Sequence, residues 1–237
     1  MLEVQIAVAK THKFASRESG DTVELVERPH GGLSVLLVDA QGSGPAAKTI
    51  SNLITSRGAA LIKDGARDGV VARTLHDYLY TLRGGRVSAT LNIVSVDLKT
   101  RTLVLSRNDE SPAYFFSTSG IEVHDEPVCC IGVYPRTKPV VVERPIDAHL
   151  GVVVTSDGVV HAGRRYGQRF DLPAFLQDEL QRGWPTAQEL AERVLNAAIA
   201  LEQGRPGDDV SVVVVTLVPT EESDAPVRRL VAHFPIE

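Results

Sequence analysis

The sequence predicts an α+β fold in which strands come in groups and helices come in pairs. Three apolar, β-branched stretches precede one pair of helical patterns, and a longer group of strand-like stretches precedes a second pair. This order differs from the regular alternation of strand and helix that builds parallel sheets. We therefore expect layers of antiparallel sheet and helix.

The first half of the chain contains the simpler patterns. Its predicted strands are residues 4–9, 22–28 and 33–39. The turn Pro29-His30-Gly31-Gly32 separates the last two strands and predicts an antiparallel pair. Apolar residues then recur at helical spacing, with Pro45 at a favourable first position, which predicts helices over residues 45–63 and 68–82.

The second half of the chain begins with a group of strands separated by polar turns. We expect these to form a meander of residues 88–97, 102–106, 113–117 and 140–142. A strand at 152–155 leads to helices at 172–180 and 186–201, and Thr186 with Glu189 three residues later predicts a capping box. The expected closing elements are a strand at 209–218, a polar loop at 219–225 and an edge strand at 227–233.

Composition limits the classes of protein that are compatible with this chain. Its 237 residues are 43% hydrophobic, enough for one sizeable core, so we expect a single domain over residues 1–237. A net charge of −5 offers no basic surface for nucleic acid or anionic membrane. No stretch is long and apolar enough for a membrane span, and we expect a cytoplasmic protein. The adjacent Cys129 and Cys130 predict buried core thiols rather than disulfide or zinc chemistry.

Acidic residues at predicted strand ends are the most informative local feature. Asp39, Asp157 and Asp209 each lie at such an end, and Asp21 begins another strand. Carboxylates brought together repel one another unless a cation neutralises them, and oxygen-only ligands favour Mg²⁺ or Mn²⁺. Two such ions can activate water for hydrolysis of a phosphate ester. The alternative is that each aspartate only stabilises its own turn.

The ordered motifs resemble those of the PP2C-type metal-dependent serine/threonine phosphatases, and most of all the bacterial SpoIIE/RsbX branch. They are Gly20-Asp21, residues 38–47 around Asp39, Thr155-Ser156-Asp157-Gly158, and Gly207-Asp208-Asp209-Val210-Ser211. The likeness covers residues 15–218 and implies a four-layer αββα sandwich, with two antiparallel sheets flanked by helical pairs. It also implies two Mn²⁺ or Mg²⁺ ions at one end of that sandwich.

The resemblance also implies a role for each residue of the site. Asp39 would bridge both ions, the Ala40 carbonyl would bind one, and Asp157 and Asp209 would hold the other. Asp21 would act on the opposite side, directly or through water, with Asp208 a weaker candidate than Asp209. Arg17, four residues before Asp21, could hold the phosphate or be a solvated loop residue.

The chain departs from the pattern of this family at three places. Ala40 stands where the family usually has glycine, which restricts the loop if that position needs a positive φ. Gln41 stands where many relatives have a histidine that can protonate the leaving group. The turn 108–112 is also unusual, and its Glu110 is either a further metal ligand or a solvated surface residue.

These observations predict a protein serine/threonine phosphatase that acts through a metal-bridging hydroxide. The resemblance to RsbX implies a phosphorylated bacterial regulatory protein as substrate, either a stressosome component or an anti-sigma antagonist with a STAS-like fold. One alternative is a non-catalytic, phosphatase-like binding module in the same signalling setting. Another is a phosphoesterase for small molecules that uses the same metals.

Overall fold

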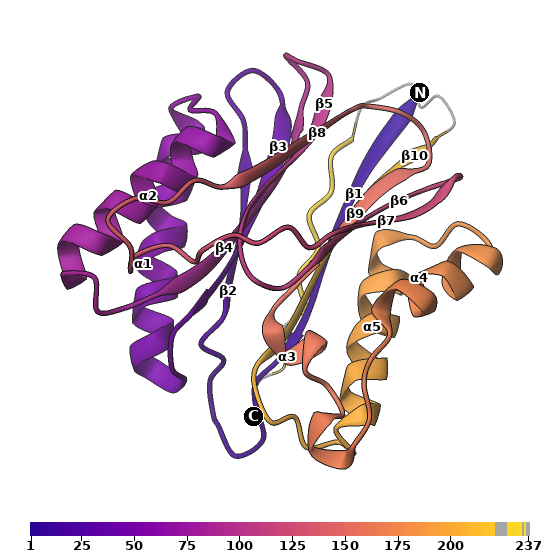
Figure 1. The fold of residues 1–237 in the computed structure, drawn as a ribbon. Helices are drawn as coiled ribbons and strands as arrows, with labels where there is room; N and C mark the ends of the chain where they lie inside the picture. The colour runs from indigo at the N-terminus through magenta and orange to yellow at the C-terminus, as the bar shows by residue number, and fades with distance from the viewer. Residues whose placement is uncertain (221–226, 234, 236–237) are drawn as a thin grey trace.

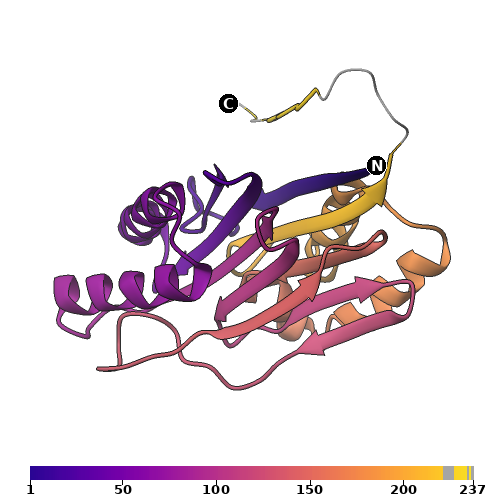
Figure 2. The same ribbon diagram turned by 90° about the horizontal axis from the view of Figure 1, so that it is seen from above.

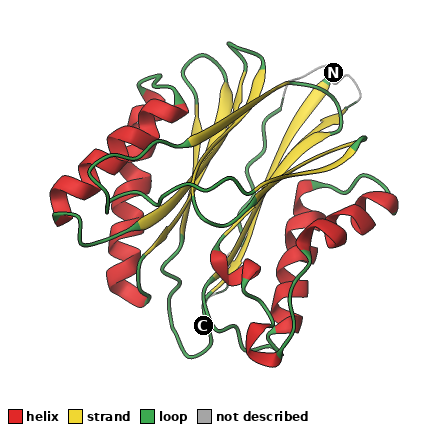
Figure 3. Cartoon of the chain, viewed as in Figure 1, coloured by secondary structure: helices red, strands yellow, loops and turns green. Residues whose placement is uncertain are grey.

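Two five-stranded antiparallel sheets packed face to face form the centre of the molecule, and a pair of long helices covers each outer face (Figure 1). The computed structural model describes residues 1–220, 227–233 and 235. Figure 3 shows the succession of layers as helix, strand, strand and helix. The expected α+β class and the four-layer αββα sandwich are therefore confirmed.

Sheet A contains both the first and the last strand of the chain. Its order is β1 (Leu2–Thr11), β10 (Val210–Pro219), β9 (Leu150–Thr155), β6 (Ala113–Ser117) and β7 (Gly120–His124). All of its neighbouring strands are antiparallel. The chain therefore builds this sheet from segments that are far apart in sequence.

Sheet B is formed mostly by the first half of the chain. Its order is β2 (Thr22–Glu27), β3 (Gly32–Ala40), β4 (Ala89–Asp97), β5 (Thr102–Asn108) and β8 (Val140–Pro145). The predicted hairpin of β2 and β3 is present, with Thr22 opposite Val38. The start of β2 and the end of β3 consequently lie side by side.

Helices α1 (Gly44–Lys63) and α2 (Asp68–Arg83) pack on sheet B, and α4 (Leu172–Gln181) and α5 (Ala187–Leu201) pack on sheet A. Figure 2, seen from above, shows the two helical pairs on opposite sides of the sandwich. A short helix α3 (Asp157–Val160) and a 3₁₀ turn η1 (Arg164–Tyr166) follow β9. No helix in the described part of the chain is long and apolar enough to cross a membrane.

The alternation of side chains along a strand explains the uninterrupted apolar runs. In β3, Leu36 and Val38 face the helices α1 and α2, whereas Val35 and Leu37 face sheet A. Successive side chains point to opposite faces, so a strand that is covered on both sides is apolar throughout. These runs fix the sheets rigidly and leave the chemistry to the turns at their ends.

Helix α5 begins with the predicted capping box. The Thr186 hydroxyl accepts a hydrogen bond from the Glu189 N–H, and the Glu189 carboxylate accepts one from the Thr186 N–H. We expect Thr186→Ala to lower the stability by about 1 kcal/mol and the Tm by roughly 2–4 °C. Thermal unfolding would measure this, with the exposed Thr118→Ala as control; equal Tm values for the two variants would contradict it.

Three expectations from the sequence are wrong. Strands β4 to β8 do not form one meander, because the chain leaves sheet B after β5, forms β6 and β7 in sheet A, and returns as β8 beside β5. Residues 227–233 form no strand and lie exposed outside both sheets (Figure 2). Cys129 is exposed and Cys130 half-buried, so neither is a core thiol. The expected loop at 219–225 falls mostly outside the described residues.

Candidate active site

Four acidic turns lie together at one end of the sandwich. Asp21 directly precedes β2 and Asp39 is near the end of β3, which are neighbours in sheet B. Asp157 lies two residues after the end of β9, and Asp208 lies two residues before β10, the neighbour of β9 in sheet A. Each carboxylate is thus held by a rigid strand and faces the turns at the sheet ends.

Asp39 lies at the electrostatic centre of this group. Burial, together with the nearby carboxylates of Asp21, Asp157 and Asp208, raises its pKa to about 9. Among the described residues, no hydrogen-bond donor contacts the Asp39 carboxylate. Without a cation, the folded protein therefore disfavours the ionised form of this carboxyl group.

The turn that carries Asp157 is packed directly against the turn before β10. A Cβ atom on Gly158 would lie 2.1 Å from the Asp209 carbonyl oxygen, so only glycine fits after Asp157. The Asp157 carboxylate is 42% exposed and lies 3.8 Å from the His161 ring, one helical turn later. Burial and the Asp208 carboxylate both raise the Asp157 pKa.

Asp208 and Asp209 are adjacent but differ in surroundings. Asp208 is exposed, and it is the member of the pair whose charge raises the pKa of both Asp39 and Asp157. The Asp209 side chain is buried, and its two oxygens accept hydrogen bonds from the N–H groups of Lys13 at 2.9 Å and Gly20 at 2.7 Å. Asp209 therefore fastens both ends of loop 13–20, and Asp208 faces the other carboxylates.

Asp21 is fully buried beside this loop. One of its carboxylate oxygens accepts a 2.6 Å hydrogen bond from the Ser211 hydroxyl, and the other has no partner among the described residues. Burial raises its pKa despite the hydrogen bond from Ser211. The ammonium groups of Lys10 and Lys48 both donate to its backbone carbonyl at 2.8 Å, which places positive charge behind it.

Ala40 and Gln41 are well accommodated at the end of β3. Ala40 continues the strand opposite Ala89 and is absent from the residues with positive φ, so alanine causes no strain here. The Gln41 side-chain oxygen accepts hydrogen bonds from the Ser88 N–H and hydroxyl at 3.2 and 3.3 Å. Gln41 therefore anchors the turn before β4 and supplies no acidic proton.

The other two sequence candidates lie at the surface. Arg17 is exposed and makes no hydrogen bond to a described residue, and Glu110 is exposed as well. The neighbour of Glu110, Asp109, is instead buried and accepts hydrogen bonds from the Asn92 amide and the Ser111 N–H. Burial raises the Asp109 pKa to about 6, and its charge also acts on Asp39. Sequence reasoning missed Asp109, because nothing local distinguishes a buried turn aspartate from an exposed one.

The donor set suits hard divalent cations. It consists of carboxylates that repel one another, and it includes the buried, unpartnered oxygen of Asp21. In the part of the chain that the structure describes, no three His, Cys, Asp or Glu side chains already converge as in a formed metal centre.

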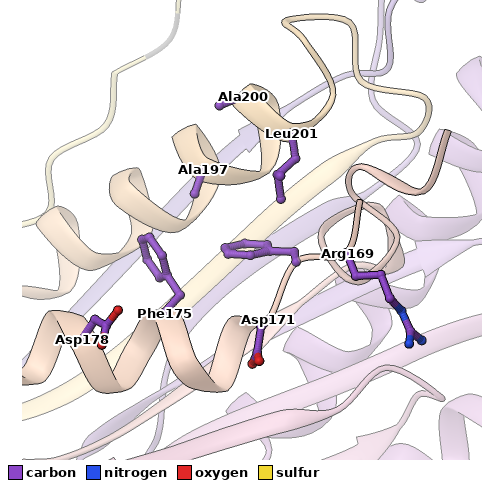
Figure 4. Close-up of a pocket in the computed structure, with 8 residues that line it drawn as sticks. Arg169, Asp171, Phe175, Asp178, Ala197, Ala200 and Leu201 are labelled. Atoms are coloured by element: carbon purple, nitrogen blue, oxygen red, sulfur yellow. The ribbon is translucent and has the colours of Figure 1, made fainter. Parts of the chain in front are cut away.

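The site is distinct from the hollow of about 540 Å³ that lies between α4, α5 and residues 169–171 (Figure 4). Phe170, Phe175 and Leu201 line that hollow, and none of the four clustered carboxylates contributes to it. The carboxylates instead lie in the turns at the sheet ends, where Asp208 is exposed and the Asp157 side chain is 42% exposed. Such an arrangement is accessible to a large substrate.

Comparison with solved structures defines the class of the fold. The phosphatase domain of SpoIIE from Bacillus subtilis with a fragment of its regulatory domain has a TM-score of 0.78 and 20% identity, over 93% of this chain and 65% of that chain. The catalytic domain of the phosphatase PstP, solved with two manganese ions, has a TM-score of 0.68 and 17% identity, over 92% and 100%. RsbX, solved with magnesium, has a TM-score of 0.67 and 15% identity, over 92% of this chain and 100% of that chain. The fold is that of the PP2C-type phosphatases.

The family is identified by its sequence model. The model described as stage II sporulation protein E (SpoIIE) matches residues 29–218, and the chain belongs to this family. No curated protein matches the chain. The resemblance that the acidic motifs indicated is therefore confirmed.

Proposed function

We propose that residues 1–237 form one metal-dependent phosphatase domain that hydrolyses phosphoserine or phosphothreonine on a regulatory protein. One observation carries the proposal: the charges of Asp157 and Asp208 act on the Asp39 carboxyl group, which has no neutralising partner among the described residues, in a fold of the PP2C type. Such mutual repulsion is costly for the folded protein unless cations are bound. Two Mn²⁺ or Mg²⁺ ions would remove it, and these ions are present in the related structures of PstP and RsbX.

We assign the metal ligands from the surroundings of each side chain. Asp39 lies between the carboxylates of both sheets and would bridge two ions, with the Ala40 carbonyl beside it. Asp157 and Asp208 would complete one ion site. The Asp209 carboxylate is already occupied by two N–H donors, so we favour Asp208 over Asp209 as the ligand. Asp21 would bind on the other side through its unpartnered oxygen.

The bound ions would supply a water of lowered pKa and neutralise the charge of the phosphoryl group. The residues of the chain would position the ligands around these ions. Asp209 keeps loop 13–20 closed over Asp21, and Lys10 and Lys48 fix the Asp21 backbone from behind. Gln41 cannot protonate the leaving alkoxide, so that proton would come from solvent, and a moderate rate is expected. Arg17 remains a candidate for contact with the phosphate, because its side chain is exposed and has no hydrogen-bond partner among the described residues.

A phosphorylated protein is the substrate class that the open site favours. Asp208 is exposed and the Asp157 side chain is 42% exposed, and neither lies in the hollow between α4 and α5, so a loop of a folded partner can approach this end of the sandwich. The likeness to SpoIIE and RsbX supports a bacterial regulatory partner, either a STAS-like protein or a stressosome component.

The decisive assay is release of phosphate from a serine-phosphorylated STAS-domain protein, with Mn²⁺, with Mg²⁺ and with EDTA. We expect turnover that requires a divalent ion and is much faster on the phosphoprotein than on free phosphoserine. Equal turnover of both substrates would favour a small-molecule phosphoesterase. Calorimetric binding of the phosphoprotein without turnover under any metal condition would instead favour a non-catalytic binding module.

A further inference from the structure

Glu202, at the end of α5, is a buried carboxylate that faces two of the acidic turns. Its side chain is 6% exposed. One oxygen accepts a 2.7 Å hydrogen bond from the Gly163 N–H, and the other accepts one from the Gly207 N–H at 3.1 Å. The Arg165 guanidinium completes its surroundings through Nε at 3.1 Å and through Nη2. Among the described residues, the donors to this carboxylate therefore come from the loop after α3 and from the turn before β10.

The two segments that Glu202 joins are those that carry Asp157 and Asp208. Gly163 lies six residues after Asp157, at the end of the loop that follows α3, and Gly207 directly precedes Asp208. The same carboxylate therefore sets the separation between a segment that leaves β9 and a segment that enters β10. Asp157 and Asp208 are the pair that we assign to one ion.

Close packing prevents these segments from shifting freely. A Cβ atom on Gly207 would lie 3.0 Å from the Arg165 guanidinium carbon, and one on Gly163 would lie 3.3 Å from the Leu201 Cβ. Arg165 also donates to the Arg205 carbonyl, so its side chain links the loop after α3 to the turn between α5 and β10.

We propose that Glu202 and Arg165 form a positioning pair that sets the spacing of Asp157 and Asp208 for a divalent cation. The inference rests on the proposed metal-dependent function. Neither residue touches substrate or ion in this scheme, and both act through the backbones of Gly163 and Gly207. Groups that orient metal ligands in this way commonly contribute about 10–100-fold in metal affinity.

A second buried glutamate provides a matched control. Glu179 in α4 is 3% exposed and pairs with Arg182 at 2.5 Å and Arg193 at 2.6 Å, so it resembles Glu202 in burial and charge. Its partners lie on α5 and at the end of α4, away from the acidic turns. Loss of the Glu179 charge should therefore affect stability without affecting the metal site.

The test is calorimetric titration of Mn²⁺ into the full chain and its variants, with Tm measured on the same samples. Glu202→Gln keeps the size of the side chain, but its amide nitrogen cannot accept the second N–H bond. We expect its Mn²⁺ Kd to rise at least about 10-fold, whereas Glu179→Gln should lower Tm and change the Kd less than about twofold. Arg165→Ala should raise the Kd in the same direction, and it decides the question if Glu202→Gln does not fold.

The outcomes separate the two levels of the proposal. Wild-type protein that binds no Mn²⁺ would overturn both the proposed function and the positioning pair. Wild-type protein that binds Mn²⁺ with the same Kd as Glu202→Gln and Arg165→Ala would overturn the positioning pair alone. An equal rise of the Kd in Glu179→Gln would also overturn it, because the effect would then be a general consequence of lost stability.

Discussion

Asp39→Asn is expected to abolish Mn²⁺-dependent hydrolysis and, at the same time, to make the metal-free protein more stable. The carboxylate would bridge both ions, so its loss should lower kcat/KM for p-nitrophenyl phosphate at least about 100-fold. Without metal, the Asp39 carboxyl group is buried among the carboxylates of Asp21, Asp157 and Asp208, which disfavour its ionisation. Asparagine removes this repulsion at nearly unchanged size, and we expect a gain of about 1–2 kcal/mol, or roughly 3–6 °C in Tm.

The sign of the stability effect follows from the pKa of Asp39. Burial and the neighbouring carboxylates raise this pKa to about 9 in the folded protein, above the ordinary value of 3.8 for an aspartate. Between these two values the unfolded chain ionises more readily, so the free energy of unfolding falls as the pH rises from about 4 to about 9. The advantage of Asp39→Asn in EDTA should therefore be small near pH 4 and grow toward pH 9. Thermal unfolding over this pH range measures it.

Asp68→Asn is the matched control for this prediction. Asp68 is also buried, but it pairs with Arg28 at 2.8 Å beyond the other end of β2 from Asp21. Its substitution should leave both the Mn²⁺-induced rise in Tm and the hydrolysis intact. Retained Mn²⁺ stabilisation in Asp39→Asn, or a lower metal-free Tm across the whole pH range, would contradict the assignment of Asp39.

The helices, the strands and the acidic turns were predictable because short, local sequence patterns specify them. Runs such as Val152 to Thr155 can only be strands covered on both sides, and Asp39 and Asp157 end such runs at points where a turn must follow. The capping box at Thr186 is likewise a four-residue pattern. The common location of Asp21, Asp39, and Asp157 also depends on strand pairing, which the sequence alone supported only through the resemblance.

The features that were missed depend on contacts between distant segments. Asp208 and Asp209 are adjacent in the sequence. Which of the two faces the other carboxylates depends on the position of loop 13–20, which binds Asp209. In the sequence, Glu202 looks like an ordinary exposed residue at a helix end. Only the folded structure shows that the loops of Gly163 and Gly207 contact its side chain. The exposed Cys129 was misjudged for the same reason, because average burial of a residue type does not locate a particular loop.

Asp208→Asn and Asp209→Asn are expected to have opposite effects on metal binding and stability. Asp208 is exposed and faces Asp39 and Asp157, so its substitution should weaken Mn²⁺ binding at least about 10-fold and leave the metal-free Tm unchanged or higher. The buried Asp209 carboxylate accepts N–H bonds from Lys13 and Gly20, and an amide can accept only one of them. Asp209→Asn should therefore lower the stability by about 1–3 kcal/mol.

Both quantities can be measured on the same protein samples, by calorimetric titration of Mn²⁺ and by thermal unfolding in EDTA. Asp209→Asn should retain more of its Mn²⁺ affinity than Asp208→Asn, because loop 13–20 affects the site only through Asp21. Asp147→Asn is a suitable control, since this aspartate is exposed and its side chain bonds, within the described part of the chain, only to the neighbouring Ala148 N–H. If Asp209→Asn loses metal binding at an unchanged Tm while Asp208→Asn binds normally, Asp209 is the ligand, as the order of the motif alone suggested.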